Sequence, residues 1–248
     1  MRIFTFDVLG YFAHFRKYTS TTSSLSYAFP PRTTIVGMIA AILGYERDNY
    51  YEIFSEERCR IALQVRSPIR RVLQTISYLM TDKPLTLEKL RGMSPPAQIR
   101  LELIIAEGEY PTEICYRIFF NHENDGLMDE LQTRLTDGKF YYPPTLGTAN
   151  SLARISRLQS IDAEIFKPQG EVAISTVIPL RALEAISQEE KVPVYIEELM
   201  PADFDLDRVP RRVEGYIYGT LGKPIKVRIK NEAFRCTVDG QEIIGTFM

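Results

Sequence analysis

Residues 35 to 43, IVGMIAAIL, are the segment that most constrains the fold, because apolar side chains cover nearly every face of the helix they predict. Such a helix is buried on all sides, so we expect it to pack beneath a sheet. Gly44 predicts its end, and a proline pair excludes helix before it. Thr33 or Thr34 is the predicted N-cap, which turns the first amides of the helix toward the preceding loop.

The loop before this helix has the composition of an anion-binding segment. No acidic residue lies between Asp7 and Glu46, and eight hydroxyl side chains lie between Tyr18 and Ser26. The cations of this segment are Arg16, Lys17 and Arg32. Because the N-terminus of a helix attracts phosphate, loop and helix together predict a site for phosphates and ribose hydroxyls. The alternative is that the hydroxyl groups only solubilise a long loop and cap the helix.

The net charge of −2 conceals an uneven distribution along the chain. Residues 1–100 hold 14 basic and 8 acidic residues, a balance of +6, whereas residues 101–248 hold 16 and 24, a balance of −8. The contrast is sharpest between residues 58–100, with nine cations and two acids, and residues 184–207, with eight acids and one lysine. The basic block favours contact with a polyanion. The acidic block is equally well explained as a solvated face.

Hydrophobic periodicity predicts an α+β chain. We expect one short helix at 47–55. A second, amphipathic helix is expected to begin at Asn124 or Asp125 and to end at Gly138. The predicted strands of the first part are 2–9, 60–66, 72–80, 99–105, 113–120 and 153–166. Apart from the basic excursion at 67–111, the order is strand, helix, strand, strand, helix, strand, as in a ferredoxin-like domain. This domain is predicted to span residues 1–166.

The excursion at residues 67–111 is long for a plain loop. Its two alternating segments predict an extended hairpin that projects as a thumb, with a tip at 81–96, and that is poorly ordered until partners cover it. The alternative is a hairpin that lies flat and extends the sheet. Residues 167–248 predict a smaller, β-rich region. Its strand candidates are 171–178, 192–197, 212–219, 224–230, 234–238 and 242–247, with Asp239-Gly240 as a tight turn.

Composition and motifs exclude several classes of protein. The longest apolar stretch falls well short of the roughly 20 residues that span a membrane, and the first strand does not read as a signal peptide. Three cysteines without a paired spacing predict buried, reduced thiols and a cytoplasmic protein. With two histidines in all, we predict no metal site and no cofactor. The glycines of 215–224 are wrongly spaced for a phosphate-binding P-loop, so a hairpin turn is expected there.

Two separated blocks carry a family resemblance. The first comprises Gly10, the FRK run at 15–17, the FPPRTT run at 29–34 and the glycine and alanines of the helix. The second is YPPTLGT at residues 142–148, followed by Leu152-Ala153. In this order they resemble the N-terminal signature and the tyrosine-proline-leucine-glycine motif of the Cas5 family. The resemblance covers about residues 1 to 165, and the FPPRTT run is most similar to the I-B branch.

The resemblance implies a RAMP-superfamily, RRM-like fold and a subunit of a type I CRISPR interference (Cascade) complex. It implies that the chain holds the 5′ handle of the crRNA without catalysis and contacts a backbone subunit and the large subunit. Target DNA is then reached indirectly, through the complex. The residues that we predict to contact RNA are Arg16, Lys17, Tyr18, Thr21, Thr22, Ser23, Tyr27, Arg32, Thr33, Thr34, Arg66, Arg70, Arg71, Tyr142, Gly147 and Arg154. The loop around Gly147 is as well explained by bracing the first loop as by RNA contact.

Two enzymatic alternatives remain open at this point. One branch of the resembled family processes guide precursors as a metal-independent endoribonuclease. Such cleavage needs a base, an acid and a cation, and His14, Lys17 and Tyr18 are the candidates to supply them, although the set of that branch does not map onto this chain residue by residue. The other alternative is an enzyme that acts on a small phosphate-bearing substrate, supported only by the basic loop.

Overall fold

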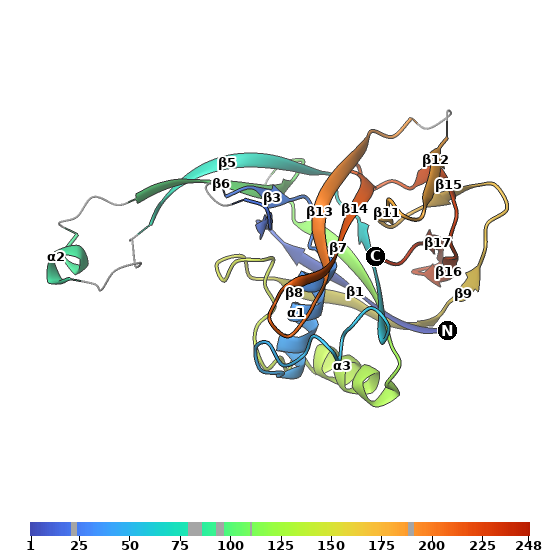
Figure 1. The fold of residues 1–248 in the computed structure, drawn as a ribbon, viewed down its shortest axis with the longest axis horizontal. Coiled ribbons are helices and arrows are strands. Elements are labelled where there is room, and N and C mark those ends of the chain that lie inside the picture. The colour runs from blue at the N-terminus through green and yellow to red at the C-terminus, as the bar shows by residue number, and fades with distance from the viewer. Residues whose placement is uncertain (21–23, 79–85, 93–96, 110, 188–190) are drawn as a thin grey trace.

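The computed structural model of the chain describes residues 1–20, 24–78, 86–92, 97–109, 111–187 and 191–248 (Figure 1). At its centre lies an antiparallel four-stranded sheet in the order β4–β7–β1–β8. Its strands are β1 (Arg2–Gly10), β4 (Cys59–Val65), β7 (Ile114–His122) and β8 (Arg154–Asp162). All four were predicted, because each alternates apolar residues over at least one face.

Two helices pack on one face of this sheet. These are α1 (Arg32–Leu43) and α3 (Asp125–Asp137). Gly44 ends α1 with a φ of 87° and Asn124 caps α3 by accepting a hydrogen bond from the Leu127 amide, both as predicted. The predicted N-cap of α1 was wrong. Pro31 occupies that position and no side chain caps the first turn, because the helix begins at Arg32, where proline's fixed φ suits an entry into helix.

Both faces of the central sheet are covered, which explains why β1 is buried along nearly its whole length. Phe4, Phe6 and Val8 point toward the helices. Ile3 points to the opposite face, where it packs with Phe234 and other residues of the C-terminal strands. The sheet therefore forms the middle layer of three.

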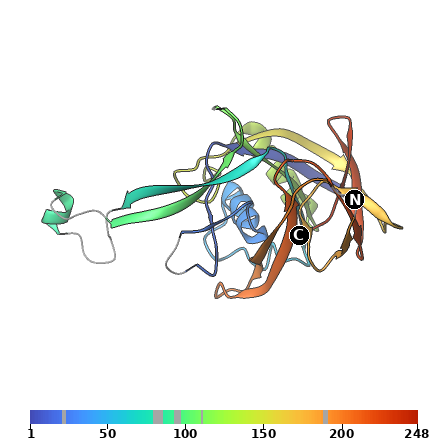
Figure 2. The ribbon, with the colours of Figure 1, turned by 90° about the horizontal axis from the view of Figure 1, so that it is seen from above.

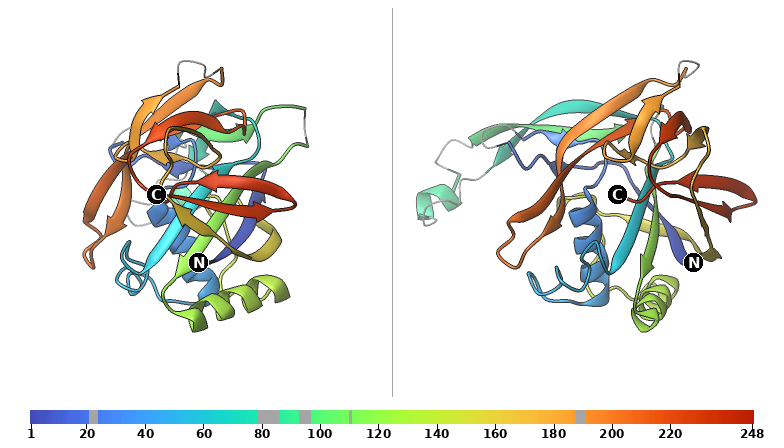
Figure 3. Two further views of the ribbon diagram at one scale, coloured as in Figure 1. Left: turned by 90° about the vertical axis from the view of Figure 1, so that its right-hand side faces the viewer. Right: turned by 45° about the vertical axis from the view of Figure 1, so that its right-hand side comes forward.

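The C-terminal part consists of short strands in three further sheets, β10–β15–β12, β11–β14–β13 and β17–β16–β9 (Figure 3, left). Their bounds are β9 Glu164–Phe166, β10 Glu171–Ile174, β11 Ile178–Pro179, β12 Leu183–Ile186, β13 Val194–Phe204, β14 Pro210–Gly219, β15 Ile225–Ile229, β16 Ala233–Val238 and β17 Gln241–Gly245. The predicted turn at Asp239-Gly240 is present, with φ values of 52° and 76° between β16 and β17.

The C-terminal part contributes to two cores. A cluster of its own includes Ile178, Ile217 and Val227. Met200 and Tyr218, however, belong to the main core between α1 and the central sheet. The strand pair β13–β14 thus closes one side of the main core and fixes the position of α1.

Three local predictions were wrong. Residues 47–55 form turns instead of a helix, and their rings pack on the core without helical periodicity. The predicted strand 171–178 is two short strands, β10 and β11, separated by a bend. The strand β12 was not predicted, because its residues lack the alternation of a half-buried strand.

The excursion forms a two-stranded ribbon that extends away from the rest of the molecule (Figures 1 and 2). Its strands are β5 (Ile69–Tyr78) and β6 (Ala97–Ala106), paired over ten positions from Ile69 with Ala106 to Tyr78 with Ala97. The single turn α2 (Leu87–Leu90) lies at its far end. Most of the predicted tip, residues 81–85 and 93–96, lies outside the described residues.

Candidate nucleic-acid interface

The basic loop is attached to the root of the β5–β6 hairpin. Its two described ends pair with each other as β2 (Phe15–Arg16) and β3 (Ser26–Tyr27). Ala13 and Ile104 exchange backbone hydrogen bonds of 3.0 and 2.8 Å. Loop and hairpin root therefore form one unit.

Glu102 on β6 strengthens this attachment. Its carboxylate accepts a hydrogen bond of 2.8 Å from the Ser26 amide, and its carbonyl oxygen lies 2.7 Å from Nδ1 of His14. His14 is buried there. The three predicted contacts Thr21, Thr22 and Ser23 lie between the two ends of the loop, outside the described residues.

Two of the predicted cations are exposed without an ion pair to any part of the chain that the structure describes. Arg16 donates a hydrogen bond of 3.3 Å to the Ser20 carbonyl, and Arg70 is exposed on β5 near the hairpin root. Tyr18, on the same loop, is 55% exposed. These side chains are available to a ligand.

Arg71 and Lys17 are instead held by a buried carboxylate. Glu197 on β13 is 1% exposed. It forms an ion pair of 2.8 Å with Lys17, a second with Arg71, and accepts a hydrogen bond from the Ala28 amide. Burial and the neighbouring Arg71 charge lower the pKa of Lys17. This cluster joins the loop, the hairpin and the C-terminal part at one point.

Two predicted contacts are corrected by the structure. Arg32 is 1% exposed, and its guanidinium donates to the carbonyl oxygens of Phe54, Cys59 and Ala202. Tyr27 is buried and donates to the Leu199 carbonyl at 2.6 Å. Neither can reach a phosphate or a base. Both were predicted from residue type alone, which does not reveal that β13 covers the start of α1.

Arg66 and Arg154 have acidic partners. Arg66 lies 2.6 Å from Asp7, a buried carboxylate that also accepts from Arg117. Arg154 is exposed and pairs with Glu113 at 2.6 Å. Each is thus partly neutralised before any ligand arrives.

Gly147 lies against the basic loop. Its φ is 98°, and a Cβ atom placed on it would lie 1.9 Å from the His14 carbonyl oxygen. The neighbouring Leu146 carbonyl accepts a hydrogen bond of 3.0 Å from the His14 amide. These contacts match the bracing explanation, since only glycine permits both the backbone conformation and the approach. Tyr142 is exposed beside the end of α1, where its amide donates to the Ala41 carbonyl.

Two adjoining cavities of about 550 and 400 Å³ share Thr34 and Gly147 in their walls. We call them together the α1 groove. The first is lined by His14, Phe15, Arg16, Ser24, Thr34, Ile99, Leu101, Gly147 and Thr148. The second is lined by Thr33, Thr34, Gly37, Met38, Ala41, Tyr50, Tyr51, Pro143, Pro144, Thr145, Gly147, Phe204 and Arg208. The groove runs from the hairpin root along α1.

The far wall of the α1 groove was missed by the sequence analysis. Tyr50, Tyr51, Phe204 and Arg208 supply three rings and a cation there. Tyr51 and Phe204 pack edge to face with ring centres 5.8 Å apart, and burial, aided by a hydrogen bond to Asp48, raises the pKa of Tyr51 well above its usual range. The adjacent tyrosine pair was a visible signal, hidden by the prediction of a helix over 47–55.

The three candidate catalytic residues are not equally free. His14 is buried against the Glu102 carbonyl, and Lys17 is paired with Glu197. Only Tyr18 is exposed. Among the described residues no three of the His, Cys, Asp and Glu side chains gather as a metal site. The described helices include none that is long and apolar enough to cross a membrane.

Comparisons with known proteins place this geometry in context. The family model described as CRISPR-associated protein (Cas_Cas5) matches residues 3–211. A solved CRISPR protein from Archaeoglobus fulgidus shares the fold, with a TM-score of 0.55, 14% identity and 99% of each chain covered. A chain of a CRISPR RNA-guided surveillance complex aligns with a TM-score of 0.47 and 12% identity, over 91% of this chain and 90% of that one. No curated protein sequence matches the chain.

Proposed function

Because the chain belongs to the Cas5 family of CRISPR-associated proteins, we propose that it is a non-catalytic, RNA-binding subunit of a type I CRISPR interference complex. In this proposal it holds the 5′ handle of the crRNA in the α1 groove. The observation that carries the proposal is the meeting of the basic loop, the hairpin root and the start of α1 around one groove with exposed cations at both ends, Arg16 and Arg208.

The chemistry of the groove suits a single-stranded RNA. Arg16 and Arg208 line the groove and are proposed to contact phosphates, although Arg208 also pairs with Asp48 at 3.5 Å. The rings of Tyr18 and Tyr50 are proposed to stack on unpaired bases. Arg70 is exposed at the root of the hairpin, outside the groove lining. Lys17 and Arg71 contribute less than their charge implies, because Glu197 already neutralises them. The sheet order β8–β1–β7–β4 supports a ferredoxin-like core of the RAMP superfamily, and the I-B assignment remains a prediction.

We further propose that the β5–β6 hairpin acts as a thumb that grips a neighbouring backbone subunit and the guide together. An exposed apolar side chain, Leu73, lies midway along β5 and is 67% exposed. Contact with the large subunit and, through the complex, with target DNA in the cytoplasm completes the proposal. Removing residues 81–96 is expected to leave the chain folded and to weaken assembly. Normal assembly of that deletion would contradict the thumb.

The α1 groove is tested by RNA binding. The variant R16Q/R208Q, which removes the two cations that line the groove, is expected to reduce the slope of log affinity against log salt by about 1.4, since each single-strand phosphate contact contributes roughly 0.7. The matched control is K191Q/K223Q, which removes the same charge from exposed positions outside the groove. A synthetic crRNA handle serves as the probe. An equal slope for the two variants would remove the α1 groove from the RNA site.

Catalysis is tested separately. Purified chain incubated with repeat RNA in EDTA is expected to yield no cleavage. The contacts that support this expectation are those that occupy His14 and Lys17. Cleavage products in EDTA would establish the endoribonuclease alternative, and their loss in the variant H14N would identify His14 as a participant.

A further inference from the structure

A second groove lies beside the last residues of the chain, where Thr246 and Phe247 line it. It has a volume of about 550 Å³, and none of its lining residues belongs to the α1 groove. Its walls are contributed by β4, by the segments that follow β9, β11 and β15, and by the last residues of the chain. We call it the C-terminal groove.

The C-terminal groove collects positive charge. Four of its lining residues are basic, and Glu232 is the one acid among them. The basic residues are Arg60, Lys167, Arg181 and Lys230. Arg181 is satisfied within the protein, with Glu56 at 2.6 Å and Glu214 at 3.4 Å. The other three form no ion pair with any residue that the structure describes.

Most of these cations come from the part of the chain that carries a net negative charge. Residues 101–248 carry a balance of −8, yet Lys167 and Lys230 from this part join Arg60 around one hollow. Uncompensated like charges that face one concavity raise the free energy of the empty protein and attract an anion from solution. The arrangement therefore points to a negatively charged ligand.

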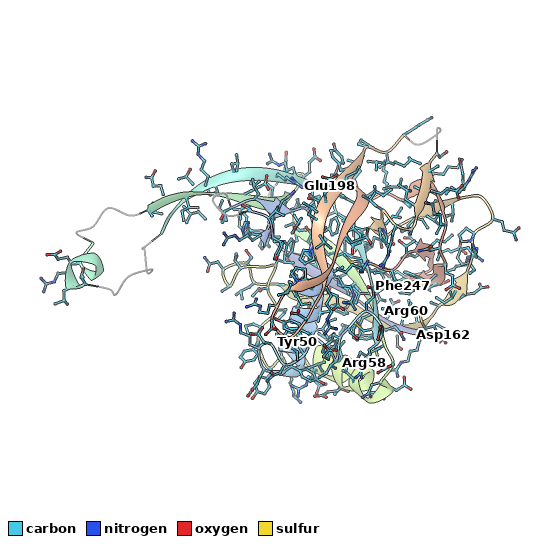
Figure 4. All side chains as sticks on the ribbon, viewed as in Figure 1. Tyr50, Arg58, Arg60, Asp162, Glu198 and Phe247 are labelled. Carbon is cyan, nitrogen blue, oxygen red and sulfur yellow. The ribbon has the colours of Figure 1, made fainter. Side chains whose placement is uncertain are left out.

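An aromatic ring stands beside one of these cations. The guanidinium of Arg60 lies 5.7 Å from the ring centre of Phe247 (Figure 4). The amide of Met248 donates to the Ile61 carbonyl at 2.8 Å, which fixes the end of the chain along β4. Phe247 remains partly exposed while its ring stacks on Phe234, at 4.9 Å between centres. Ring and guanidinium thus form a preformed platform.

Backbone hydrogen bonds hold the other wall in place. The Lys230 amide donates to the Ala182 carbonyl at 2.8 Å. The Thr246 hydroxyl donates to the Val177 carbonyl at 3.1 Å, and its amide donates to Thr176. The cations are therefore presented by ordered segments, so little conformational entropy is lost when a ligand binds.

We propose that the C-terminal groove binds the phosphodiester backbone of a single-stranded nucleic acid, at a site separate from the α1 groove. Three cations without ion pairs to the described residues lie on separate segments and suit successive phosphates. The ring of Phe247, stacked on Phe234, supports one of them, Arg60. Cations on three separate segments suit a strand with several phosphates better than a single small anion. The strand is either RNA or DNA, and the two share the chemistry that the groove recognises.

The test uses the full-length chain with the α1 groove already weakened by R16Q/R208Q. In this background R60Q/K167Q/K230Q is compared with the control K139Q/K191Q/K223Q, which loses the same charge from exposed positions outside both grooves. The probes are fluorescein-labelled single-stranded RNA and DNA of twelve mixed pyrimidines. We expect the groove variant to bind at least one probe on the order of tenfold more weakly at 0.1 M salt, with a slope lower by about 2.

The possible outcomes distinguish RNA from DNA as the ligand of the C-terminal groove, and they test this groove independently of the α1 groove. Loss for the RNA probe alone identifies a guide-type strand, loss for DNA alone identifies a target-type strand, and loss for both supports a general phosphodiester site. Equal affinity and slope for the groove variant and its control, with both probes, overturns the inference. Because the handle site is tested by its own variant, failure here leaves that result unaffected.

Discussion

Two antiparallel strand pairs of this protein, β1–β7 and β5–β6, differ in what lies against their faces. Both faces of β1–β7 are covered, and its side chains are buried almost without interruption. Among the described side chains of β5–β6, the buried ones are those of Ile69, Leu101, Ile104 and Ala106, and none of them lies farther from the root than Leu101, midway along the ribbon. The same backbone pairing thus produces a rigid core in one place and a ribbon dependent on external contacts in the other, because stability comes from burial more than from ladder hydrogen bonds.

Hydrogen exchange measures the contrast directly. The amides of β7 are expected to exchange only through global unfolding, with protection of about 5–15 kcal/mol. Amides at 74–77 and 97–101, in the outer half of the hairpin, are expected to open at several kcal/mol less, because little apolar surface holds them. Binding of RNA and a backbone subunit should raise their protection. Equal protection of both pairs in the free chain would remove the contrast.

A matched pair of leucines tests the energetic side of the comparison. Leu63 on β4 is fully buried, whereas Leu73 on β5 is 67% exposed. Leu63→Ala is expected to lower the free energy of unfolding by about 2–5 kcal/mol, since it leaves a cavity. Leu73→Ala is expected to change it by no more than about 0.5 kcal/mol. Urea unfolding followed by circular dichroism measures the free energy of unfolding of both variants. A large decrease for Leu73→Ala would show that Leu73 packs against another part of the protein.

The joint between the hairpin and the C-terminal part is Glu197, and the neighbouring Glu198 is an exposed control (Figure 4). Glu197→Gln is expected to cost about 1–3 kcal/mol of stability, because a buried carboxylate loses its pairs with Lys17 and Arg71. The same change releases two cations, so RNA affinity should rise and its salt slope steepen by roughly 0.7 to 1.4. Glu198→Gln should alter neither.

If Glu197→Gln lowered both stability and RNA affinity, the two cations would be needed in their present geometry. Their pairing with Glu197 would then position them for RNA instead of neutralising them. Thermal melting measures stability and fluorescence anisotropy measures RNA affinity, so the two measurements on the same samples show whether Glu197 positions the two cations or neutralises them.

A smaller, pH-dependent effect is expected on the core side, at Asp239. Its hydrogen bond from Arg117 lowers the pKa of this carboxyl below its usual range. A group whose pKa is lower in the folded than in the unfolded chain stabilises above its unfolded value of about 3.9, and that contribution is lost as pH falls through the folded value. Asn suits the positive φ of 52° at this position.

Asp239→Asn is therefore expected to cost about 1 kcal/mol or less at pH 7, and the difference from the unaltered chain should vanish as the pH falls below about 4. Chemical denaturation at several pH values provides the measurement. If the loss of stability in Asp239→Asn stayed constant down to acid pH, it would arise from the conformation of the turn and not from the charge of the carboxylate.

Much of the fold was predictable from local pattern. The order of strands and helices, the stops at Gly44 and Gly138 and the turn at Asp239-Gly240 each depend on a few neighbouring residues, whose periodicity or backbone freedom decides the outcome. The basic loop and the long hairpin were likewise visible as stretches of composition. The family followed from two short motifs, and the match over residues 3–211 confirmed it.

Only the tertiary structure decided which side chains are available to a ligand. Arg32 and Tyr27 are buried because β13, about 170 residues further along the chain, covers the start of α1. For the same reason Glu197, predicted only as part of a charged block, became the partner of Lys17 and Arg71. The C-terminal groove gathers cations from segments that no local pattern connects. Burial and ion pairing depend on contacts between segments that are distant in the sequence. The sequence alone therefore shows where the charged residues are. Packing determines which of these side chains remain free to bind a ligand.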